Sequence, residues 1–234
     1  MYKRILLKIS GEQLAGQYGH GIDPEFVSWL ANEVKQVTDE GVQVVIMVGG
    51  GNMVRGAQVA GHGIKRVTAD HMGMLSTMIN ALAVTDIFEE RGLPTRCLSA
   101  IFAAQVAEPF VHRLANKHLE KGRIVIVAGG SGRPYVTTDT AAVILALELD
   151  CEIVLKATKV DGVYDKDPAK HDDAKKLTSL SYQQAVEDSA ISVMDKAALG
   201  MAMEQQIPIM VYKLDIDGNI ARAARGEDVG TKIG

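Results

Sequence analysis

The sequence has little cysteine, and its cysteines and histidines are not spaced like the ligands of a metal ion. The 234 residues include two cysteines, Cys97 and Cys151, and neither has another cysteine or a histidine at ligand spacing. We expect both to be small buried hydrophobic side chains in a reducing compartment, and not a disulfide pair. The six histidines are also spaced unlike ligands, so no metal site built from the protein alone is predicted.

Long apolar runs and a surplus of one charge are also missing. No apolar run approaches about 20 residues, which excludes a membrane-spanning helix, and the N-terminus lacks the pattern of a cleaved leader. These absences predict a cytoplasmic protein. The formal net charge of −4 argues against binding to nucleic acid or to a membrane surface. A small phosphorylated ligand remains compatible with it, because a few local cations and backbone N–H groups can hold phosphates.

Short apolar runs alternate with amphipathic stretches along the whole chain. With 47% hydrophobic residues, the chain can build a sizeable core. Asp23-Pro24 is typical of a helix start, and apolar residues then recur at helical spacing until Gly41. The alternation predicts one doubly wound α/β domain over 1–234, with a mostly parallel sheet and right-handed crossovers. The expected strands are 5–9, 42–48, 95–98, 124–127, 153–155 and 207–212, and the expected helices are 24–40, 69–91, 108–121, 138–148 and 196–206, followed by a last helix–strand pair.

Three of these strands run directly into glycine, at Ser10-Gly11, at 49–51 and at 129–132. In an open α/β sheet, ligands bind beyond the carboxyl ends of the strands, and glycine there lets backbone N–H groups approach phosphate oxygens. Any one of these loops by itself is better explained as an ordinary strand-to-helix turn. Three at one edge favour a phosphate site. The chain has neither the P-loop pattern G-x-x-x-x-G-K-[ST] nor G-x-G-x-x-G, so a P-loop or a dinucleotide site is not indicated.

Two cations lie close to these loops. Lys8 interrupts the first strand just before Ser10-Gly11, and Arg55 follows the second glycine loop. A lysine at a strand end is commonly a solvated edge residue. Phosphoryl transfer, however, needs positioning and neutralisation of charge more than covalent chemistry, and two cations on two loops fit that need.

Several carboxylates stand at element ends, where capping or turn formation explains them equally well. Asp70 begins an expected helix and is either an N-cap or an acceptor for ribose hydroxyls. Asp139 opens another helix and is also placed to hold a lysine. Around the loop after 153–155 lie Lys156, Thr158, Asp161 and Asp167, in which Asp161-Gly162 and Asp167-Pro168 are alternatively plain turns.

Taken together, these segments resemble the bacterial uridylate (UMP) kinases of the amino-acid-kinase superfamily. The matching strings cover nearly the whole chain in family order. The D-H-M-G-M and K-A-T-K-V-D-G-V-Y strings are the most specific of them. The strings are K-R-I-L-L-K-I-S-G-E (3–12), G-G-G-N with R-G (49–52 and 55–56), D-H-M-G-M (70–74), T-T-D (137–139), L-K-A-T-K-V-D-G-V-Y (155–164), D-P-A-K (167–170) and V-M-D (193–195).

The resemblance implies an αβα sandwich and Mg²⁺-dependent transfer from ATP to UMP, giving UDP and ADP for pyrimidine nucleotide biosynthesis. It also implies a homohexamer, with an acceptor-binding N-terminal part and an ATP-binding C-terminal part. The implied catalytic residues are Lys8, Arg55 and Asp139. The ATP-binding residues are Lys8, Ile9, Ser10, Gly11, Gly51, Arg55, Thr158, Tyr164 and Asp167, and the UMP-binding residues are Gly50, Asp70, Ser131, Gly132, Arg133, Pro134, Tyr135, Val136, Thr137 and Thr138.

The acceptor loop departs from the family pattern. It reads Ser131-Gly132-Arg133-Pro134 where Thr-Gly-Asn-Pro is expected, so Arg133 adds a cation near the acceptor phosphate. Members of the family are commonly activated by GTP and inhibited by UTP. The loop Gly16, Gln17, Tyr18, Gly19, His20 and Gly21 lies in the segment tied to that response, although its composition alone indicates only a flexible surface loop.

Two rival interpretations remain. A carbamate or amino-acid kinase of the same superfamily would share the fold and the ATP side but lack the D-H-M-G-M segment. A non-catalytic nucleotide-binding relative would have lost the catalytic cations, whereas Lys8 and Arg55 are present in this sequence.

The Met-rich helix from Met72 through Met78 and Leu82 carries more apolar surface than one core stripe needs, which predicts a subunit contact there.

Overall fold

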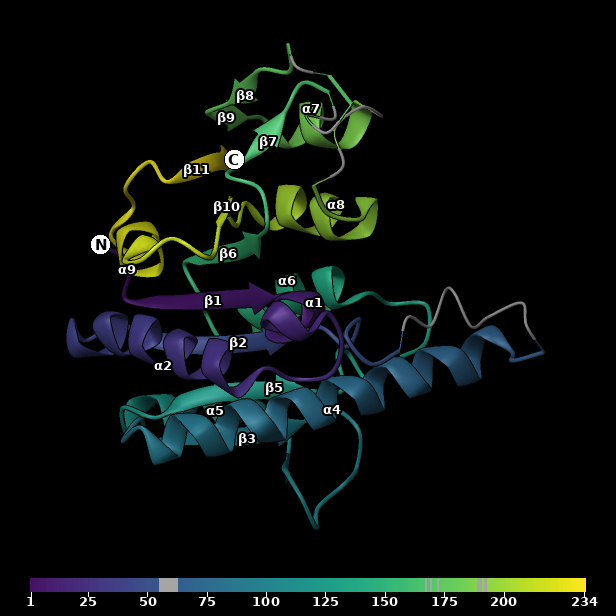
Figure 1. The fold of residues 1–234 in the computed structure, drawn as a ribbon, viewed down its shortest axis with the longest axis vertical. Helices are drawn as coiled ribbons and strands as arrows, with labels where there is room; N and C mark the ends of the chain where they lie inside the picture. The colour runs from purple at the N-terminus through teal and green to yellow at the C-terminus, as the bar shows by residue number, and fades with distance from the viewer. Residues whose placement is uncertain (55–62, 167, 169, 172, 189–190, 192) are drawn as a thin grey trace.

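The computed structural model describes residues 1–54, 63–166, 168, 170–171, 173–188, 191 and 193–234, and its centre is a nine-stranded sheet. All pairings in this sheet are parallel except the one between β10 and β11. In Figure 1 the strands β6, β1, β2 and β5 succeed one another from top to bottom. In spatial order the strands are β4 (Glu108–Pro109), β3 (Thr95–Ser99), β5 (Ile124–Ala128), β2 (Gln43–Val48), β1 (Arg4–Ile9), β6 (Ile153–Thr158), β10 (Ile209–Lys213), β11 (Gly230–Ile233) and β9 (Ser179–Leu180). A separate hairpin pairs β7 (Val163–Tyr164) with β8 (Lys176–Leu177).

Helices cover both faces of the sheet. The central strands are buried on both sides, which is why they are nearly continuous runs of branched apolar residues. This arrangement confirms the predicted α/β class, with a mostly parallel sheet between two helical layers. The helices are α1 (Gly11–Leu14), the 3₁₀ turn η1 (Gly16–Tyr18), α2 (Pro24–Asp39), α4 (Arg66–Glu90), α5 (His112–Glu120), α6 (Thr138–Glu148), α7 (Tyr182–Glu187), α8 (Lys196–Gln205) and α9 (Asn219–Arg225).

Alternation along β1 divides the core into two clusters. Ile5, Leu7 and Ile9 pack with α2, α4 and α9 on one face, whereas Leu6 packs with α5, α6 and α8 on the other. Because side chains alternate between faces, Lys8 lies on the same side as Leu6. This lysine, 7% exposed, therefore faces the α6 layer from within the sheet.

Several expected boundaries agree with the structure. Asp23 caps α2 by accepting hydrogen bonds from the backbone N–H groups of Glu25 (3.0 Å) and Phe26 (3.4 Å). The predicted helices 138–148 and 196–206 correspond to α6 and α8. In the described part of the chain, no helix is long and apolar enough to cross a membrane.

Two predicted boundaries are wrong. The long helix α4 begins at Arg66, with Lys65 at the N-cap position, and not at residue 69. The expected helix 108–121 is divided, because Glu108–Pro109 forms the edge strand β4 and the helix begins only at His112. Proline is tolerated on an edge strand because its missing N–H faces no neighbour.

Candidate active site

The carboxyl ends of β1, β2, β5 and β6 bring the predicted loops to one edge of the sheet. The arrows of β1 and β6 point the same way in Figure 1, as their parallel pairing requires. Lys8 of β1 is in register with Met47 of β2 and with Lys156 of β6. Strand pairing therefore sets two lysines side by side, each within two residues of its strand end.

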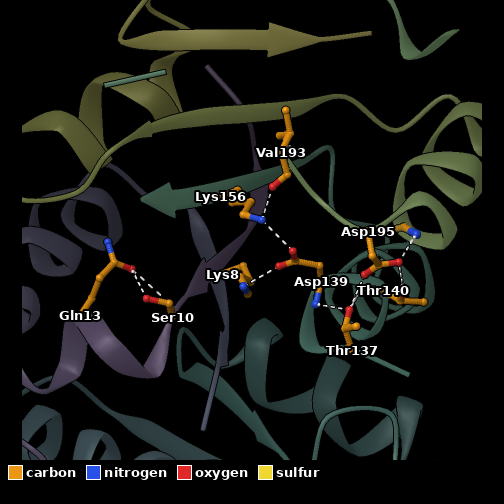
Figure 2. A network of polar contacts seen from close by, with 10 residues as sticks. Lys8, Ser10, Gln13, Thr137, Asp139, Thr140, Lys156, Val193 and Asp195 are labelled. Carbon is orange, nitrogen blue, oxygen red and sulfur yellow. Dashed lines mark hydrogen bonds and ion pairs between the residues drawn. The ribbon is translucent and has the colours of Figure 1, made fainter. Parts of the chain in front are cut away.

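A single carboxylate joins these two lysines. Asp139, in the first turn of α6, lies with Oδ1 2.5 Å from Nζ of Lys8 and with Oδ2 2.6 Å from Nζ of Lys156. Figure 2 shows the two ammonium groups converging on this side chain. Lys156 also donates to the carbonyl oxygen of Val193. The three charged side chains are between 9% and 16% exposed, so solvent screens their interactions only weakly.

The electrostatics of this cluster keep Asp139 ionised. Burial raises the pKa of Asp139, but the charges and hydrogen bonds of Lys8 and Lys156 outweigh it and hold that pKa below the ordinary value. Burial lowers the pKa of Lys156, and repulsion from Lys8 adds to this, while attraction to Asp139 opposes it. Lys8, Lys156 and Asp139 together carry one surplus positive charge, which suits a phosphate ligand, and the carboxylate of Asp195 also attracts Lys156.

A second carboxylate, Asp195, fastens the start of α6 to the start of α8. Its Oδ1 accepts from Oγ1 of Thr140 at 2.7 Å and from the N–H of Ala198 at 3.0 Å, and its Oδ2 accepts from Thr137. Thr137 in turn caps α6 by accepting from the N–H of Asp139 at 3.1 Å. These contacts, drawn in Figure 2, fix the turn that carries Asp139. Asp195 was not among the predicted site residues, although the V-M-D string that ends in it was a signal.

The glycine loops pack tightly against one another. A Cβ on Gly11 would lie 2.7 Å from the backbone nitrogen of Gly51 and 2.8 Å from the carbonyl oxygen of Gly49. A Cβ on Gly50 would lie 2.8 Å from the carbonyl oxygen of Gly73 in α4. At positions 11 and 50, glycine is therefore required by contact between backbones. Gly51 has more room, with its nearest neighbour 3.7 Å from a built Cβ.

A cavity of about 200 Å³ opens between the glycine loops of β2 and β5 and the first turns of α4. Of the predicted acceptor residues, Gly50, Asp70, Ser131, Val136, Thr137 and Thr138 line it. Gly132, Arg133, Pro134 and Tyr135 belong to the same loop but do not line the cavity in this structure. The other lining residues are Gly51, Val54, Arg66, Ala69, Gly73, Met74, Thr77, Gly129 and Gly130.

Asp70 faces this cavity from the second turn of α4, so it is not the N-cap of that helix. Its carboxylate accepts from Nε of Arg66, at 2.8 Å and 3.0 Å, and from the backbone N–H of Tyr135 at 2.8 Å. Arg66 also lies over the ring of Tyr135, 5.2 Å from the centroid. Tyr135 adopts a φ of +68°, which is unusual for a residue with a side chain. A capping role for Asp70 is excluded, and its carboxylate remains available to a ligand.

Of the predicted adenosine-side residues, the structure describes Thr158 and Tyr164, and each has its own hydrogen-bond partner. Oγ1 of Thr158 donates to the carbonyl oxygen of Val160 at 2.6 Å, and the side chain lines another cavity, of about 480 Å³. The hydroxyl of Tyr164 donates to Asp161 at 2.7 Å, and Asp161 also pairs with Lys176 at 3.1 Å. This pairing lowers the pKa of Asp161, with the Tyr164 hydrogen bond the main cause.

The remaining predicted residues are less informative. Ile9 is fully buried in the core, so only its backbone can serve a ligand. Ser10 forms a capping box with Gln13 at the start of α1. Arg55 and Asp167 lie outside the described residues, and their predicted roles stay predictions. In the loop of residues 16–21, residues 16–20 are exposed, and Gly21 donates from its N–H to the carbonyl oxygen of Asn52 at 3.2 Å.

Comparisons with known proteins agree on one family. The sequence model of the Amino acid kinase family matches residues 3–213. The chain is 50% identical over 232 residues to a uridylate kinase of Dichelobacter nodosus (strain VCS1703A), covering 99% of this chain and 96% of that protein. The crystal structure of UMP kinase from Bacillus anthracis superposes with a TM-score of 0.95 at 39% identity, over 100% of this chain and 96% of that one. The crystal structure of UMP kinase from Ureaplasma parvum gives 0.93 at 31% identity, over 100% and 99%.

Proposed function

Because the chain belongs to the amino acid kinase family, we propose that it transfers the terminal phosphoryl group of ATP to UMP, giving UDP and ADP. Similarity to uridylate kinases extends over nearly the whole length, which favours this acceptor over carbamate or an amino acid. The main observation in favour of phosphoryl transfer is that the cavity beside Asp70 adjoins the cluster of Lys8, Asp139 and Lys156. Thr137 and Thr138 line the cavity beside Asp70, and the next residue, Asp139, holds Lys8 and Lys156.

In the proposed reaction, an oxygen of the UMP phosphate attacks the γ-phosphorus of ATP. A new P–O bond forms, the bond from that phosphorus to the bridging oxygen breaks, and its electron pair leaves with ADP. The acceptor phosphate has a second pKa near 6, so it is largely a dianion at neutral pH and needs no general base. Asp139 is accordingly a holder of lysines and not a base. Lys8 neutralises charge on the phosphoryl group in flight.

Mg²⁺ is expected to accompany ATP. Within the described residues, no group of three or more His, Cys, Asp or Glu side chains is placed to hold a metal ion. Oδ1 of Asp139 is buried and pairs with the ammonium group of Lys8. Such a donor set fits a Mg²⁺ ion that would be held mainly by phosphate oxygens and water, with Asp139 as a protein carboxylate that would help to hold it. The ion would add positive charge beside the phosphates.

The substrate assignments extend this proposal. We assign Lys8, Ser10, Gly11, Gly51 and the backbone of Ile9, with Arg55, to the ATP phosphates. Thr158, Tyr164 and Asp167 are assigned to adenosine, and Gly50, Asp70 and the loop 131–138 to UMP. In this proposal the N-terminal part binds the acceptor and the C-terminal part binds ATP, within one domain over 1–234.

The decisive assay is acceptor-dependent release of ADP. With ATP and Mg²⁺ present, UMP should stimulate release strongly, and CMP, carbamate, acetylglutamate and aspartate should stimulate it weakly or not at all. Stimulation by carbamate or an amino acid instead would replace the proposed acceptor. Nucleotide binding without any turnover would favour a non-catalytic nucleotide-binding protein.

Changing Asp70 to asparagine tests the ribose assignment. The shape is kept and the charge removed, so the KM for UMP should rise by roughly 10- to 100-fold, the range for a hydrogen bond to a charged group. The Arg66–Asp70 pair is partly exposed and one turn apart on the helix, so stability should fall by less than about 1 kcal/mol. Steady-state kinetics and thermal melting measure both, with Glu90→Gln at the exposed end of α4 as the control. An unchanged KM for UMP would show that Asp70 does not bind the acceptor.

Association of subunits is proposed on the outer face of α4. Leu75 is 55% exposed and Ile79 is 51% exposed, one turn apart on a helix whose opposite side is already buried. With the family resemblance, this favours a homohexamer. Light scattering should show a hexamer that Ile79→Lys weakens and that Ile216→Lys, at a different exposed apolar residue, leaves intact. A stable and active monomer would contradict the proposal.

We infer that UTP competes with UMP, since it differs from UMP only by added phosphates and can extend from the acceptor pocket toward Lys8. GTP activation would need a separate site that favours the active arrangement of subunits, with the loop of residues 16–21 involved. Initial rates at subsaturating UMP, with each nucleotide added in turn, separate the two effects. A cytoplasmic location is inferred for the same enzyme.

A further inference from the structure

A pair of buried asparagines lies beneath the glycine loop that follows β2. Asn52 ends the G-G-G-N segment and is 7% exposed, whereas Asn80 lies in the middle of α4 and is fully buried. Their amide groups bond reciprocally: Nδ2 of Asn52 donates to Oδ1 of Asn80 at 2.9 Å, and Nδ2 of Asn80 donates to Oδ1 of Asn52 at 2.7 Å. Amides buried in this way are costly to leave unpaired, so the pair strongly favours one arrangement.

The second N–H of each amide reaches a main-chain carbonyl. Asn80 donates to the carbonyl oxygen of Gly49 at 2.7 Å, and Asn52 donates to that of Gly21 at 2.5 Å. Both amide nitrogens thus use both of their hydrogens. A carbonyl oxygen can only accept, so these contacts also determine which way each amide is turned. The network joins α4, the glycine loop of β2 and the end of the loop of residues 16–21.

Gly11 packs against the two oxygen atoms that accept hydrogen bonds from Asn80. A Cβ at Gly11 would meet Oδ1 of Asn52 and the carbonyl oxygen of Gly49, both acceptors of the Asn80 amide. Asn80 therefore fixes the surface against which the loop after β1 packs. That loop begins two residues after Lys8, so the network supports the contact between the two glycine loops.

We propose that Asn80 is a positioning residue for phosphoryl transfer. Through Asn52 and the carbonyl of Gly49 it holds the loops of residues 10–11 and 49–51 at a fixed separation, without touching a substrate. This inference rests on the proposed function, in which Ser10, Gly11 and Gly51 hold the ATP phosphates and Gly50 belongs to the acceptor site. A misplacement of reacting groups by about 1 Å can cost on the order of 100-fold in rate. A purely structural pair would affect stability alone.

The test compares Asn80→Ala with Val84→Ala, a change at another buried residue of α4. Val84 lies four residues further along the same buried side of α4 and is fully buried, but it does not contact the glycine loops through hydrogen bonds. Both variants should melt at lower temperature than the wild type. At a temperature where all are folded, Asn80→Ala should lose about 10- to 100-fold in kcat, and Val84→Ala should stay within about twofold. If kcat of Asn80→Ala is also within twofold of wild type, the positioning role is wrong.

A double-mutant cycle adds a second readout. Because Asn52 and Asn80 act as one unit in this proposal, Asn52→Ala with Asn80→Ala should lower kcat about as much as either change alone. Additive losses would overturn the coupling. If Asn80→Ala does not fold, Asn80→Ser and Asn52→Ser give smaller perturbations, and normal kcat in both would overturn the proposal. The activity of the wild type with UMP is measured first. If the wild type uses a different acceptor, the variants are compared with the wild type on that acceptor. Failure of the proposed function is thereby separated from failure of this inference.

Discussion

Replacing Lys8 with methionine is expected to lower kcat by about 100- to 1,000-fold, the range found when one preorganised electrostatic donor is removed. Methionine fills the space of the lysine stem but carries no charge. Lys8 is buried and oriented by Asp139, and the neighbouring ammonium group of Lys156 is already bound to Asp139 and to the carbonyl oxygen of Val193. Charge spreads over the phosphoryl oxygens mainly in the transition state, so the loss should fall on kcat more than on the KM for ATP.

The control for this variant is Lys35→Met. Lys35 pairs with Asp39 on the exposed side of α2, 2.6 Å apart, and both side chains are at least half exposed. Its kcat should be unchanged. Initial-rate kinetics with both substrates varied would decide the matter. Near-normal kcat with only a raised KM for ATP would show that Lys8 contributes to ground-state binding alone.

Replacing Asp139 with asparagine is expected to lower the free energy of unfolding by about 3–5 kcal/mol near neutral pH, because the partner of two buried charges is lost. In the variant, Lys8 and Lys156 face each other with no anion between them. The surface change Asp39→Asn should stay within about 0.5 kcal/mol. Urea unfolding measures both. A loss below about 1 kcal/mol for Asp139→Asn would mean that the cluster contributes little to stability.

The pH dependence of this difference has a definite sign. The folded pKa of Asp139 lies below its ordinary value near 3.9, so its contribution is present above that value and is lost as the pH falls through the folded pKa. The folded pKa of Lys156 is already lowered, and it should fall further without Asp139. Raising the pH through that pKa discharges the lysine and relieves the repulsion. The difference between wild type and variant should therefore be largest near neutral pH and shrink toward both extremes.

The sequence predicts those parts of the site whose positions follow from the order and direction of the strands. Parallel strands end at one edge, so the three glycine loops could be placed together before any contact was known. The suggestion that Asp139 holds a lysine is confirmed, and the structure shows that it holds two. The sequence predicts too late a start for α4, because Lys65 and Arg66 carry no apolar signal and Asp70 resembles an N-cap residue. At Glu108, proline in the next position imitates the first turn of a helix.

Other features had no local signal at all. Asp195 bonds to Thr140 across 55 positions of the chain, and Asn80 bonds to Asn52 across 28. A buried asparagine in the middle of a helix is unfavourable by propensity, and nothing within its own turn indicates which distant loop it holds. Such pairs depend on how helices pack on the sheet.

The contacts of Asp70 also bear on the entropy of binding. Arg66 and the backbone N–H of Tyr135 hold its carboxylate from two directions. A carboxylate has about four lone-pair positions, so these contacts leave acceptor capacity toward the cavity. The rotamer freedom of this side chain is thus given up when the chain folds, and a hydroxyl group that bonds to it does not bear that cost again.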